Sequence, residues 1–500
     1  MTLPAWATGL PDAEGSRSAD SWAIEDQGIP SLELMEAASA GLATLVQEVA
    51  PDGEVVVVCG GGNNGGDGYA CARLLRDAWR EVRVLTTSDP ASLTGDAAVQ
   101  LQRLPGDVPR RFDPALLDGA AVIVDALLGT GFTGEPRGLV ADAIAAIADS
   151  GVPVVACDVP SGVDAGTGEI AGRAVRAVAT ATFHAAKPGL YVEPGKGRAG
   201  DVRVVDIGIP AGAPVPEPDV GLIADAALLE ELPRRGAAWT KFTSGHVLVA
   251  GGSRGLLGAL ILASEAAGRA GAGYVTACVP ESEQPVVAAH VVEVMQLALP
   301  AEDGHHVAEG VRVVLAEAHR RGGALVLGPG LGRSEPAAAF ARAAAAQAPV
   351  ALVLDADGLN AHAGLLDDLG AREASTVLTP HEGELGRLLG VPSEDVRARR
   401  LHHAREAARR AHAVVVLKGD DTLVAEPGGQ VLVSPGATPA LATAGTGDVL
   451  SGVIGALLAR GVEPVTAAAA AVRLHARAGV LAATRLGVDA PRRSTRWGVR

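Results

Sequence analysis

Short apolar runs alternate with helical stretches along nearly all of this 500-residue chain. The runs are rich in valine and carry no polar alternation, which indicates strands that are buried on both faces. The stretches between them are rich in alanine and leucine. Buried strands separated by helices are typical of a parallel sheet that helices cover on both sides. We therefore expect a doubly wound α/β fold.

The predicted elements fall into two groups. In the first half we expect strands at 55–59, 82–86, 122–125, 154–158, 179–184 and 202–206, and helices at 68–78, 95–104 and 139–150. In the second half we expect strands at 247–250, 274–278, 324–327, 351–355, 376–379 and 414–418, a hairpin at 422–425 and 430–434, and helices at 447–460 and 465–486.

The chain is longer than one hydrophobic core usually serves, so two domains are expected. The stretch "GIPAGAPVPEPD" lacks periodicity and separates the two groups of elements. We predict a first α/β domain at 1–213, a linker at 214–221, a second α/β domain at 222–489 and a basic tail at 490–500.

Composition narrows the class of protein. Hydrophobic residues make up 48% and charged residues 20%, which is typical of a globular chain, and the net charge is −16. Such a charge provides no general basic surface for nucleic acid or anionic lipid. The four cysteines lack metal-type spacing, and we find no signal peptide or membrane span. We expect a cytoplasmic homo-oligomer that binds small molecules, without nucleic-acid or membrane partners.

The stretch "VVVVCGGGNNGGDGYACARLL" contains the dinucleotide pattern G-x-G-x-x-G at Gly60, Gly62 and Gly65, which favours a Rossmann-like first domain. Alone, the pattern is a weak signal for a redox cofactor. The next strand ends "VRVLTTSDP", so the acid expected to hold a ribose arrives late, at Asp89. Asn63, Asn64 and Asp67 add oxygen ligands that a pyrophosphate turn does not need.

Three polar residues follow or end successive strands of this first sheet. Asn64, Asp125 and Ser161 should meet at one edge, because the carboxyl ends of parallel strands lie together. All-oxygen ligands suit a hard cation, and a monovalent one is less surprising with a single carboxylate.

The motifs "GIPSLELMEAAS", "CGGGNNGGDG", "VDALLGTGFTG", "DVPSGVD", "TFHAAKPGL" and "VVDIGIP" make the first domain resemble the NAD(P)H-hydrate epimerases. The resemblance covers nearly all of residues 18–210 and implies inversion at C6 of the hydrated nicotinamide ring. It also implies that Asn64, Asp125 and Ser161 hold potassium. The implied substrate contacts are Asn63, Asn64, Gly65, Gly66, Asp67, Gly129, Thr130, Gly131, Phe132, Thr133, Gly134, Glu135 and Asp158.

Inversion at C6 requires a bond to be broken and remade there. Asp158 is the carboxylate placed to move a proton, with Lys187 as a weaker candidate. A surface lysine before a Pro-Gly turn is an equally good interpretation of Lys187. The string "MEAAS" departs from the family, which more often has Asn and Gly there.

In the second half, "TPALATAGTGDVLSGVIGALLARG" places a Gly-Thr-Gly-Asp turn directly before an apolar helix. The backbone N–H groups of such a helix start can bind a transferring phosphoryl group. Asp448 then lies where a base would accept a hydroxyl proton. The alternative is that Asp448 only caps the helix.

This turn resembles the ribokinase-like superfamily. The strings "HVLVAGGSRGLLGALILASEAAGRAGAGYVT", "GPGLG", "LDADGLN" and "LTPHEGELGRLLG" narrow the resemblance to ADP-dependent NAD(P)H-hydrate dehydratases, over about residues 240–485. That family phosphorylates the 6-hydroxyl of the S hydrate with ADP and then eliminates phosphate. "TAGTGD" and "GATPALAT" depart from the usual family sequences.

The second resemblance also implies binding residues. For the hydrate they are Ala259, Gly330, His381 and Asp448; for the nucleotide, Lys418, Gly419, Asp420, Asp421, Thr422 and Gly447. A lone histidine is usually a satisfied polar group, but its place at a strand end favours a site role for His381. Asp355, Asp357 and Asn360 could organise magnesium through water, although helix capping is the better interpretation.

Together the two halves predict a bifunctional repair enzyme for NAD(P)H hydrates, with potassium, magnesium and ADP as its cofactors and co-substrate. The alternative is a ribokinase-like small-molecule kinase, for a vitamin precursor or sugar, fused to a non-catalytic nucleotide-binding domain. An NAD-dependent dehydrogenase fits least, because the second half offers no hydride-acceptor site.

Overall fold

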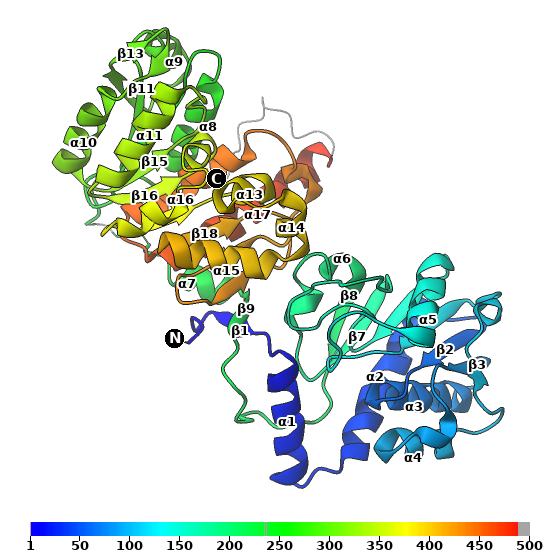
Figure 1. The fold of residues 1–500 in the computed structure, drawn as a ribbon. Coiled ribbons are helices and arrows are strands. Elements are labelled where there is room, and N and C mark those ends of the chain that lie inside the picture. The colour runs from blue at the N-terminus through cyan, green and yellow to red at the C-terminus, as the bar shows by residue number, and fades with distance from the viewer. Residues whose placement is uncertain (1, 235, 237, 489–500) are drawn as a thin grey trace. The chain divides into compact units, whose positions relative to one another are not determined.

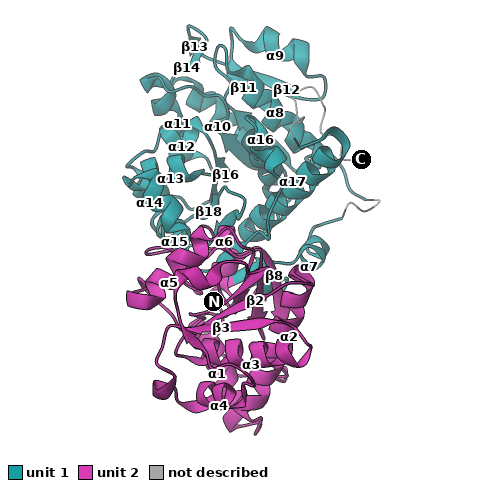
Figure 2. Ribbon diagram, turned by 90° about the vertical axis from the view of Figure 1, so that its right-hand side faces the viewer, with its two compact units in different colours: residues 1, 3–8, 221–500 teal, residues 2, 9–220 magenta. Residues whose placement is uncertain are grey.

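The computed structural model describes residues 2–234, 236 and 238–488, which form two compact units (Figures 1 and 2). Gly9–Val220 make up the N-terminal unit, magenta in Figure 2. Leu3–Thr8 and the residues from Gly221 onward make up the C-terminal unit, in teal. Within the described ranges, no helix combines the length and the apolar composition that crossing a bilayer requires. The predicted basic tail, 490–500, lies outside the described residues.

The N-terminal unit contains a seven-stranded sheet in the order β4-β3-β2-β5-β6-β7-β8. Neighbouring strands are parallel, as expected for strands joined by crossover helices. Its strands are β2 (Val55–Cys59), β3 (Val82–Thr86), β4 (Arg110–Arg111), β5 (Val122–Ala126), β6 (Val154–Cys157), β7 (Ala179–Phe183) and β8 (Asp201–Val205). Its helices are α1 (Ala13–Glu25), α2 (Ser31–Val49), α3 (Asn63–Asp77), α4 (Gly95–Arg103), α5 (Gly138–Asp149) and α6 (Lys196–Ala199).

Successive side chains of β2 pack into two different hydrophobic cores, because the side chains of a strand alternate between its two faces. Val55, Val57 and Cys59 pack with residues of α2 and α3. Val56 and Val58 pack with residues of α5 on the other face. The continuous apolar run in the sequence thus becomes a strand that is fully buried on both sides.

The C-terminal unit contains an eleven-stranded sheet in the order β1-β9-β20-β19-β18-β17-β16-β15-β10-β11-β12. The strands from β18 to β12 are parallel, and β18, β19 and β20 form an antiparallel meander. The strands are β1 (Ala7–Gly9), β9 (Val220–Ile223), β10 (His246–Ala250), β11 (Tyr274–Pro280), β12 (Met295–Leu299), β15 (Ala324–Leu327), β16 (Ala351–Leu354), β17 (Thr376–Leu378), β18 (Val414–Leu417), β19 (Leu423–Ala425) and β20 (Val431–Val433). A separate pair joins β13 (Ala301–Glu302) to β14 (His305–His306).

Helices of the C-terminal unit cover this sheet as the alternation predicts. The core on one face joins side chains of α8, α16 and α17 to those of the central strands. The helices are α7 (Asp225–Glu230), α8 (Leu257–Arg269), α9 (Gln284–His290), α10 (Gly310–Arg321), α11 (Glu335–Gln347), α12 (Asp357–Asn360), α13 (Glu382–Leu389), α14 (Ser393–Ala398), α15 (Arg400–Ala411), α16 (Thr446–Ala459) and α17 (Pro464–Leu486). The predicted α/β class, with two doubly wound sheets, is confirmed.

Three sequence boundaries differ from the structure. The predicted helix at 68–78 begins earlier, at Asn63, because the glycines of the turn already adopt helical geometry. The predicted domain 1–213 also loses its N-terminal residues to the other unit. The structure pairs β1 with β9, and Trp6 is 6% exposed in the core of the C-terminal unit. Val220 and Gly221, at the end of the predicted linker, begin β9.

Candidate functional site

The N-terminal unit contains a cavity of about 660 Å³ at the carboxyl ends of its strands. This volume is in the usual range for ligand sites, and open α/β sheets bind ligands at this edge. Eight of the predicted contacts line the cavity: Asn63, Asn64, Asp67, Gly129, Thr130, Gly131, Phe132 and Asp158. Gly65, Gly66, Thr133, Gly134 and Glu135 are not among the lining residues.

Gly65 and Gly66 have a structural reason to be glycine. A Cβ on Gly65 would lie 2.1 Å from the carbonyl oxygen of Gly60, and a Cβ on Gly66 would lie 2.9 Å from Met35 Cε. Gly65 therefore lets the start of α3 approach the end of β2 closely, and Gly66 lets it approach Met35 of α2.

Asp158 lines the cavity directly after β6, and its backbone is in the left-handed region, with φ of 66°. Its Oδ1 lies 2.7 Å from Nζ of Lys187. Its Oδ2 accepts hydrogen bonds from the backbone N–H and the hydroxyl of Thr130, at 2.9 and 2.6 Å. Burial alone would raise the pKa of Asp158, but Lys187 and Thr130 outweigh it, and the pKa is lowered. Asp158 is therefore an ionised carboxylate with its oxygens engaged.

Lys187 is not a surface lysine, so that interpretation is wrong. Its side chain is 3% exposed, and Nζ also donates to the Thr182 hydroxyl and the Phe183 carbonyl oxygen, at 2.9 and 3.0 Å. A buried ammonium needs such partners, because desolvation of an unpaired charge is costly.

The three predicted cation ligands lie together around Leu128. Asn64 Nδ2 donates to the Leu128 carbonyl oxygen at 3.0 Å, and Leu128 N–H donates to Ser161 Oγ at 2.9 Å. Ser161 Oγ in turn donates to Asp125 Oδ1 at 2.6 Å. Asp125 is fully buried, and this burial raises its pKa to about 6 despite hydrogen bonds from Ser161 and Leu127.

Asp67 is 7% exposed and lies among other acids. Burial raises its pKa well above the ordinary value, and the charges of Asp158 and Asp20 raise it further. Asp20 is on α1, a helix that the sequence motifs did not connect with the site. Burial also raises the pKa of Asp20, so the cavity joins the Asp158–Lys187 ion pair to two carboxyls of raised pKa.

In the C-terminal unit, Asp448 lies in the first turn of α16. The N-cap is Gly445, with φ of 97°, and no side chain caps the helix, so the capping interpretation of Asp448 is wrong. The first N–H groups of a helix have no partner within it and remain available to an anion. Burial and the charge of Asp355 raise the pKa of Asp448 to about 7, against the opposing charge of Lys418.

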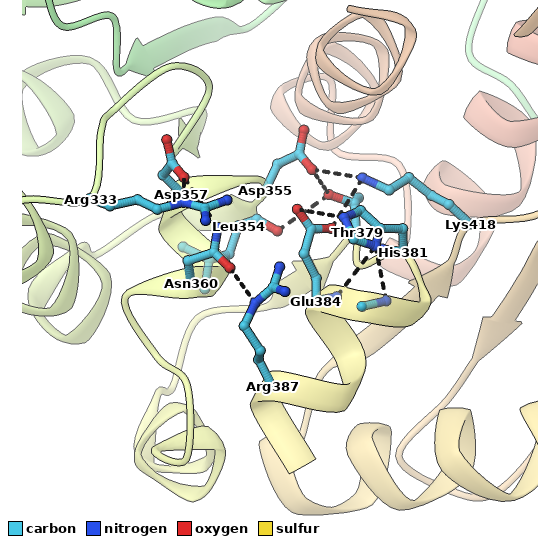
Figure 3. Close-up of polar contacts among 11 residues, drawn as sticks. Arg333, Leu354, Asp355, Asp357, Asn360, Thr379, His381, Glu384, Arg387 and Lys418 are labelled. Carbon is cyan, nitrogen blue, oxygen red and sulfur yellow. Dashed lines mark hydrogen bonds and ion pairs between the residues drawn. The ribbon is translucent and has the colours of Figure 1, made fainter. Parts of the chain in front are cut away.

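Lys418 lies between two acids, Asp355 and Glu384 (Figure 3). Its Nζ lies 3.2 Å from Asp355 Oδ1 and 3.6 Å from Glu384 Oε2. A Cβ on Gly447 would lie 3.4 Å from this Nζ, so Lys418 approaches the start of α16. Burial lowers the pKa of Lys418, but Asp355 and Glu384 outweigh it and the pKa is raised. Lys418 is therefore a fixed positive charge beside the candidate phosphoryl site.

Asp355, Asp357 and Asn360 do not cap α12, which has no side-chain cap, so that interpretation is wrong. Asp357 instead accepts hydrogen bonds from Gly332 N–H and Arg333 Nε, at 3.0 and 2.9 Å. Asp355 Oδ1 accepts from the Thr379 hydroxyl at 2.8 Å, while its buried Oδ2 has no partner within the described chain.

His381 is the N-cap of α13 and forms a capping box with Glu384. Its Nδ1 accepts hydrogen bonds from the N–H groups of Gly383 and Glu384, at 3.0 and 3.3 Å. The pKa of His381 is lowered, and burial is the largest cause. The charges of Lys418 and Arg387 lower it further, while the charge of Glu384 opposes them. The neutral ring therefore carries its proton on Nε2, which is left to donate.

The other residues predicted to bind the hydrate or the nucleotide differ in their surroundings, and some of them make contacts that stabilise the fold. A Cβ on Gly330 would lie 3.2 Å from Ala259 Cβ, so these two positions are adjacent. Asp421 is 1% exposed and pairs with Arg400, at 2.9 Å from Nε to Oδ2. Thr422 donates its hydroxyl to the Gly419 carbonyl oxygen at 2.7 Å and closes the turn. Asp420 accepts from Ala437 N–H at 3.4 Å.

Sequence reasoning missed Glu384, Arg400 and the cavity face of α1. The Glu at the third position after His381 is the usual partner in a capping box, so "HEGE" carried a readable signal for Glu384. No pattern in the sequence indicated a role for Arg400, because its partner Asp421 lies in a separate part of the fold.

Comparisons with known proteins agree with this division of the chain. A family model described as "YjeF-related protein N-terminus" matches residues 31–189, and one described as "NAD(P)H-hydrate dehydratase" matches 247–495. The bifunctional NAD(P)H-hydrate repair enzyme Nnr of Salinibacter ruber is 40% identical over 96% of this chain and 93% of its own. That of Moorella thermoacetica is 39% identical over 94% and 91%. A solved ADP/ATP-dependent NAD(P)H-hydrate dehydratase from Bacillus subtilis is 28% identical, with a TM-score of 0.45 over 54% of this chain and 91% of its own.

Proposed function

This chain belongs to the bifunctional NAD(P)H-hydrate repair enzymes, and we propose that each of its two units carries out one step of the repair. The N-terminal unit epimerises the R and S hydrates at C6. The C-terminal unit dehydrates the S hydrate to NAD(P)H at the expense of ADP. The observation that carries this division is that each unit has its own acid–base centre, with Asp158 in one and Asp448 in the other.

For epimerisation, the substrate nicotinamide enters the cavity beside the Asp158–Lys187 pair. The ring nitrogen adjoins C6, so its lone pair can expel the 6-hydroxyl and form an iminium. Water then adds to the opposite face of C6. Asp158 is the base for this addition, because its lowered pKa keeps it ionised and so able to accept a proton. The start of α3 and residues 129–132 line the same cavity and bind the nucleotide.

Potassium fits the oxygen atoms gathered around Leu128. Asn64, Asp125 and Ser161 would hold it, and their single carboxylate suits a monovalent ion. The buried Asp125 supports this assignment, because a bound cation would stabilise its ionised form. Bound there, the ion would fix the loop after β5 that contacts the substrate.

For dehydration, Asp448 accepts the proton of the 6-hydroxyl as its oxygen attacks the terminal phosphoryl group of ADP, and AMP leaves. The N–H groups at the start of α16 and the charge of Lys418 stabilise the transferring group. Phosphate then departs from C6, and loss of a proton from C5 restores the dihydronicotinamide. Phosphorylation converts a poor leaving group into a good one.

Ala259, Gly330 and the Nε2 proton of His381 would orient the hydrate, and residues 418–422 would hold the adenosine nucleotide. Magnesium supplies charge neutralisation to the phosphates when bound. Asp355 suits it through water, because its buried Oδ2 lacks a partner within the described chain. The structure holds Asp421 in a buried ion pair, so we assign it to shaping the nucleotide turn rather than to direct contact.

The test supplies purified protein with R and S NADH hydrate, ADP or ATP, magnesium and potassium, and follows NADH absorbance. Conversion of both epimers, faster than spontaneous epimerisation allows, is expected, and omission of potassium should slow only the R epimer. Turnover of a sugar or pyrimidine alcohol with no turnover of hydrate would instead support the kinase alternative. The kinase alternative assigns no function to the buried Asp158–Lys187 ion pair in the N-terminal cavity. Homo-oligomer formation stays a prediction, to be measured by size in solution.

A further inference from the structure

Helix α1 forms one wall of the epimerase cavity, although the matched family region begins only at residue 31. Its cavity-facing residues are spaced by three or four, as one helix face requires: Ala13, Ser16, Arg17, Asp20 and Ile24. Its other face is fixed by packing, since Ala19 and Ala23 belong to a core with Leu34, Ala38 and Ile207. The polar face is therefore held toward the cavity.

Asp20 is the only acid on this face of α1. Its side chain is exposed to the cavity, and its carboxylate has no hydrogen bond or ion pair with any residue that the structure describes. Burial raises its pKa, as does the charge of Asp158, against the opposing charge of Lys187. Asp20 therefore retains a proton more readily than an ordinary aspartate.

Asp158 has the opposite properties. Lys187 and Thr130 hold it as an ionised carboxylate, so it accepts a proton but does not supply one. Expulsion of the 6-hydroxyl requires a proton, because hydroxide is a poor leaving group. Two carboxyls whose environments drive their pKa values apart are typical of an acid and its partner base.

Resting on the proposed epimerase function, we propose that Asp20 is the proton donor that converts the departing 6-hydroxyl of the hydrate to water. The C6–O bond breaks as the lone pair of the ring nitrogen forms the iminium, and the Asp20 proton passes to the leaving oxygen. A water oxygen then bonds to the other face of C6, the iminium electrons return to nitrogen, and Asp158 takes the proton. Asp158 then releases its proton to solvent and solvent returns one to Asp20, so the step is balanced without a further reactant.

Other groups in the cavity fit this role less well. Asp67 also lines the cavity and has a raised pKa, but its side chain is only 7% exposed, whereas Asp20 is exposed to the cavity. Burial and Lys187 lower the pKa of His184, which leaves it neutral. The charged or titratable groups that face Asp20 across the cavity come from α1, α3, α4 and the segments after β6 and β7: Arg17, Asp67, Asp96, Asp158, His184 and Lys187.

The test compares Asp20→Asn, which keeps the shape of the side chain, with Glu25→Gln on the same helix. Glu25 is exposed and is not a lining residue, so its variant replaces a carboxyl by an amide outside the cavity. We expect Asp20→Asn to slow R-to-S epimerisation by about 10²–10⁴-fold, the usual contribution of a general acid. Glu25→Gln should epimerise at the wild-type rate, and both variants should dehydrate S hydrate normally.

A pH profile separates proton donation from a structural role. Wild-type epimerisation should slow as pH rises above the raised pKa of Asp20, because the donor loses its proton. Asp20→Asn should lack this alkaline decline, while Asp20→Glu should restore part of the rate and the decline. A wild-type rate in Asp20→Asn, or an alkaline decline lost in Asp67→Asn and retained in Asp20→Asn, would overturn the proposal. A wild-type protein that does not epimerise at all would instead reject the proposed function.

Discussion

Asp158 begins the glycine-bearing loop after β6, and Asp448 follows the glycines at the start of α16, yet their surroundings shift their pKa values in opposite directions. Asp158 meets an ammonium and three hydrogen-bond donors besides, so its ionised form is favoured despite burial. Asp448 meets burial and the charges of Asp355 and Glu384, so its neutral form is favoured despite Lys418. Residue type alone does not distinguish these environments.

The raised pKa of Asp448 predicts the pH dependence of dehydration. The base must be ionised, so kcat/KM for the S hydrate should fall about tenfold per pH unit below about 7 and level off above it. Asp448→Asn should lower dehydration by at least about 10²-fold and leave R/S interconversion intact. Both are measured with S hydrate and ADP. Wild-type dehydration in this variant would show that Asp448 is not the base.

At the scale of elements, the glycine-rich turn decides where α3 begins. The apolar strand and the later helical pattern were readable from the sequence, but the first turn of α3 was predicted as loop. Helix formation there requires the backbone of Gly65 to approach the end of β2 more closely than a side chain permits. Helix propensity does not predict such a contact, because it treats glycine only as a residue that disfavours a helix.

This contact predicts different outcomes for two neighbouring glycines. Gly65→Ala forces a Cβ onto the Gly60 carbonyl oxygen and should destabilise the N-terminal unit by about 1–3 kcal/mol. Gly62→Ala meets nothing within 4 Å and should cost less than about 1 kcal/mol. Heat inactivation of epimerisation measures both variants. Equal sensitivity of the two would contradict the close approach at Gly65.

At the scale of the molecule, the first residues of the chain belong to the C-terminal unit rather than to the N-terminal one. The first strand, β1, adds to the edge of the C-terminal sheet beside β9. Trp6 packs with Ile223 and Leu228 in the core of that unit. The N-terminal residues therefore belong to the unit whose other members begin more than 200 residues later in the chain.

Trp6→Ala should accordingly weaken the dehydratase and spare the epimerase. Truncation of a buried aromatic side chain costs about 3–5 kcal/mol. We expect faster heat inactivation of dehydration, with epimerisation retained. Trp79→Ala is the matched control, because Trp79 is 95% exposed and should change neither. Parallel loss of both activities in Trp6→Ala would contradict the assignment of β1.

The separation of the two sites into two units also predicts that variants inactive in different units should complement each other in a mixture. Asp158→Ala should consume S hydrate and leave R hydrate, apart from spontaneous epimerisation. Asp448→Ala should interconvert the epimers without forming NADH. Because each centre is built from residues of one unit, an equimolar mixture of the two variants should convert both epimers fully. Failure of the mixture, with each single activity intact, would show that the sites must share one chain.

The sequence by itself determined the fold class and most strand positions, and it singled out Asp158 and Asp448 as the candidate catalytic aspartates. These follow from local information: apolar runs, helical periodicity and glycine-bearing turns extend over a few residues, and parallel strands bring their ends to one edge. Only the tertiary structure decided the ionisation of Asp158 by Lys187, the burial of Asp421 by Arg400, the place of β1 and the cavity face of α1. Each depends on contacts or charges between separate elements, which packing creates and local patterns do not encode.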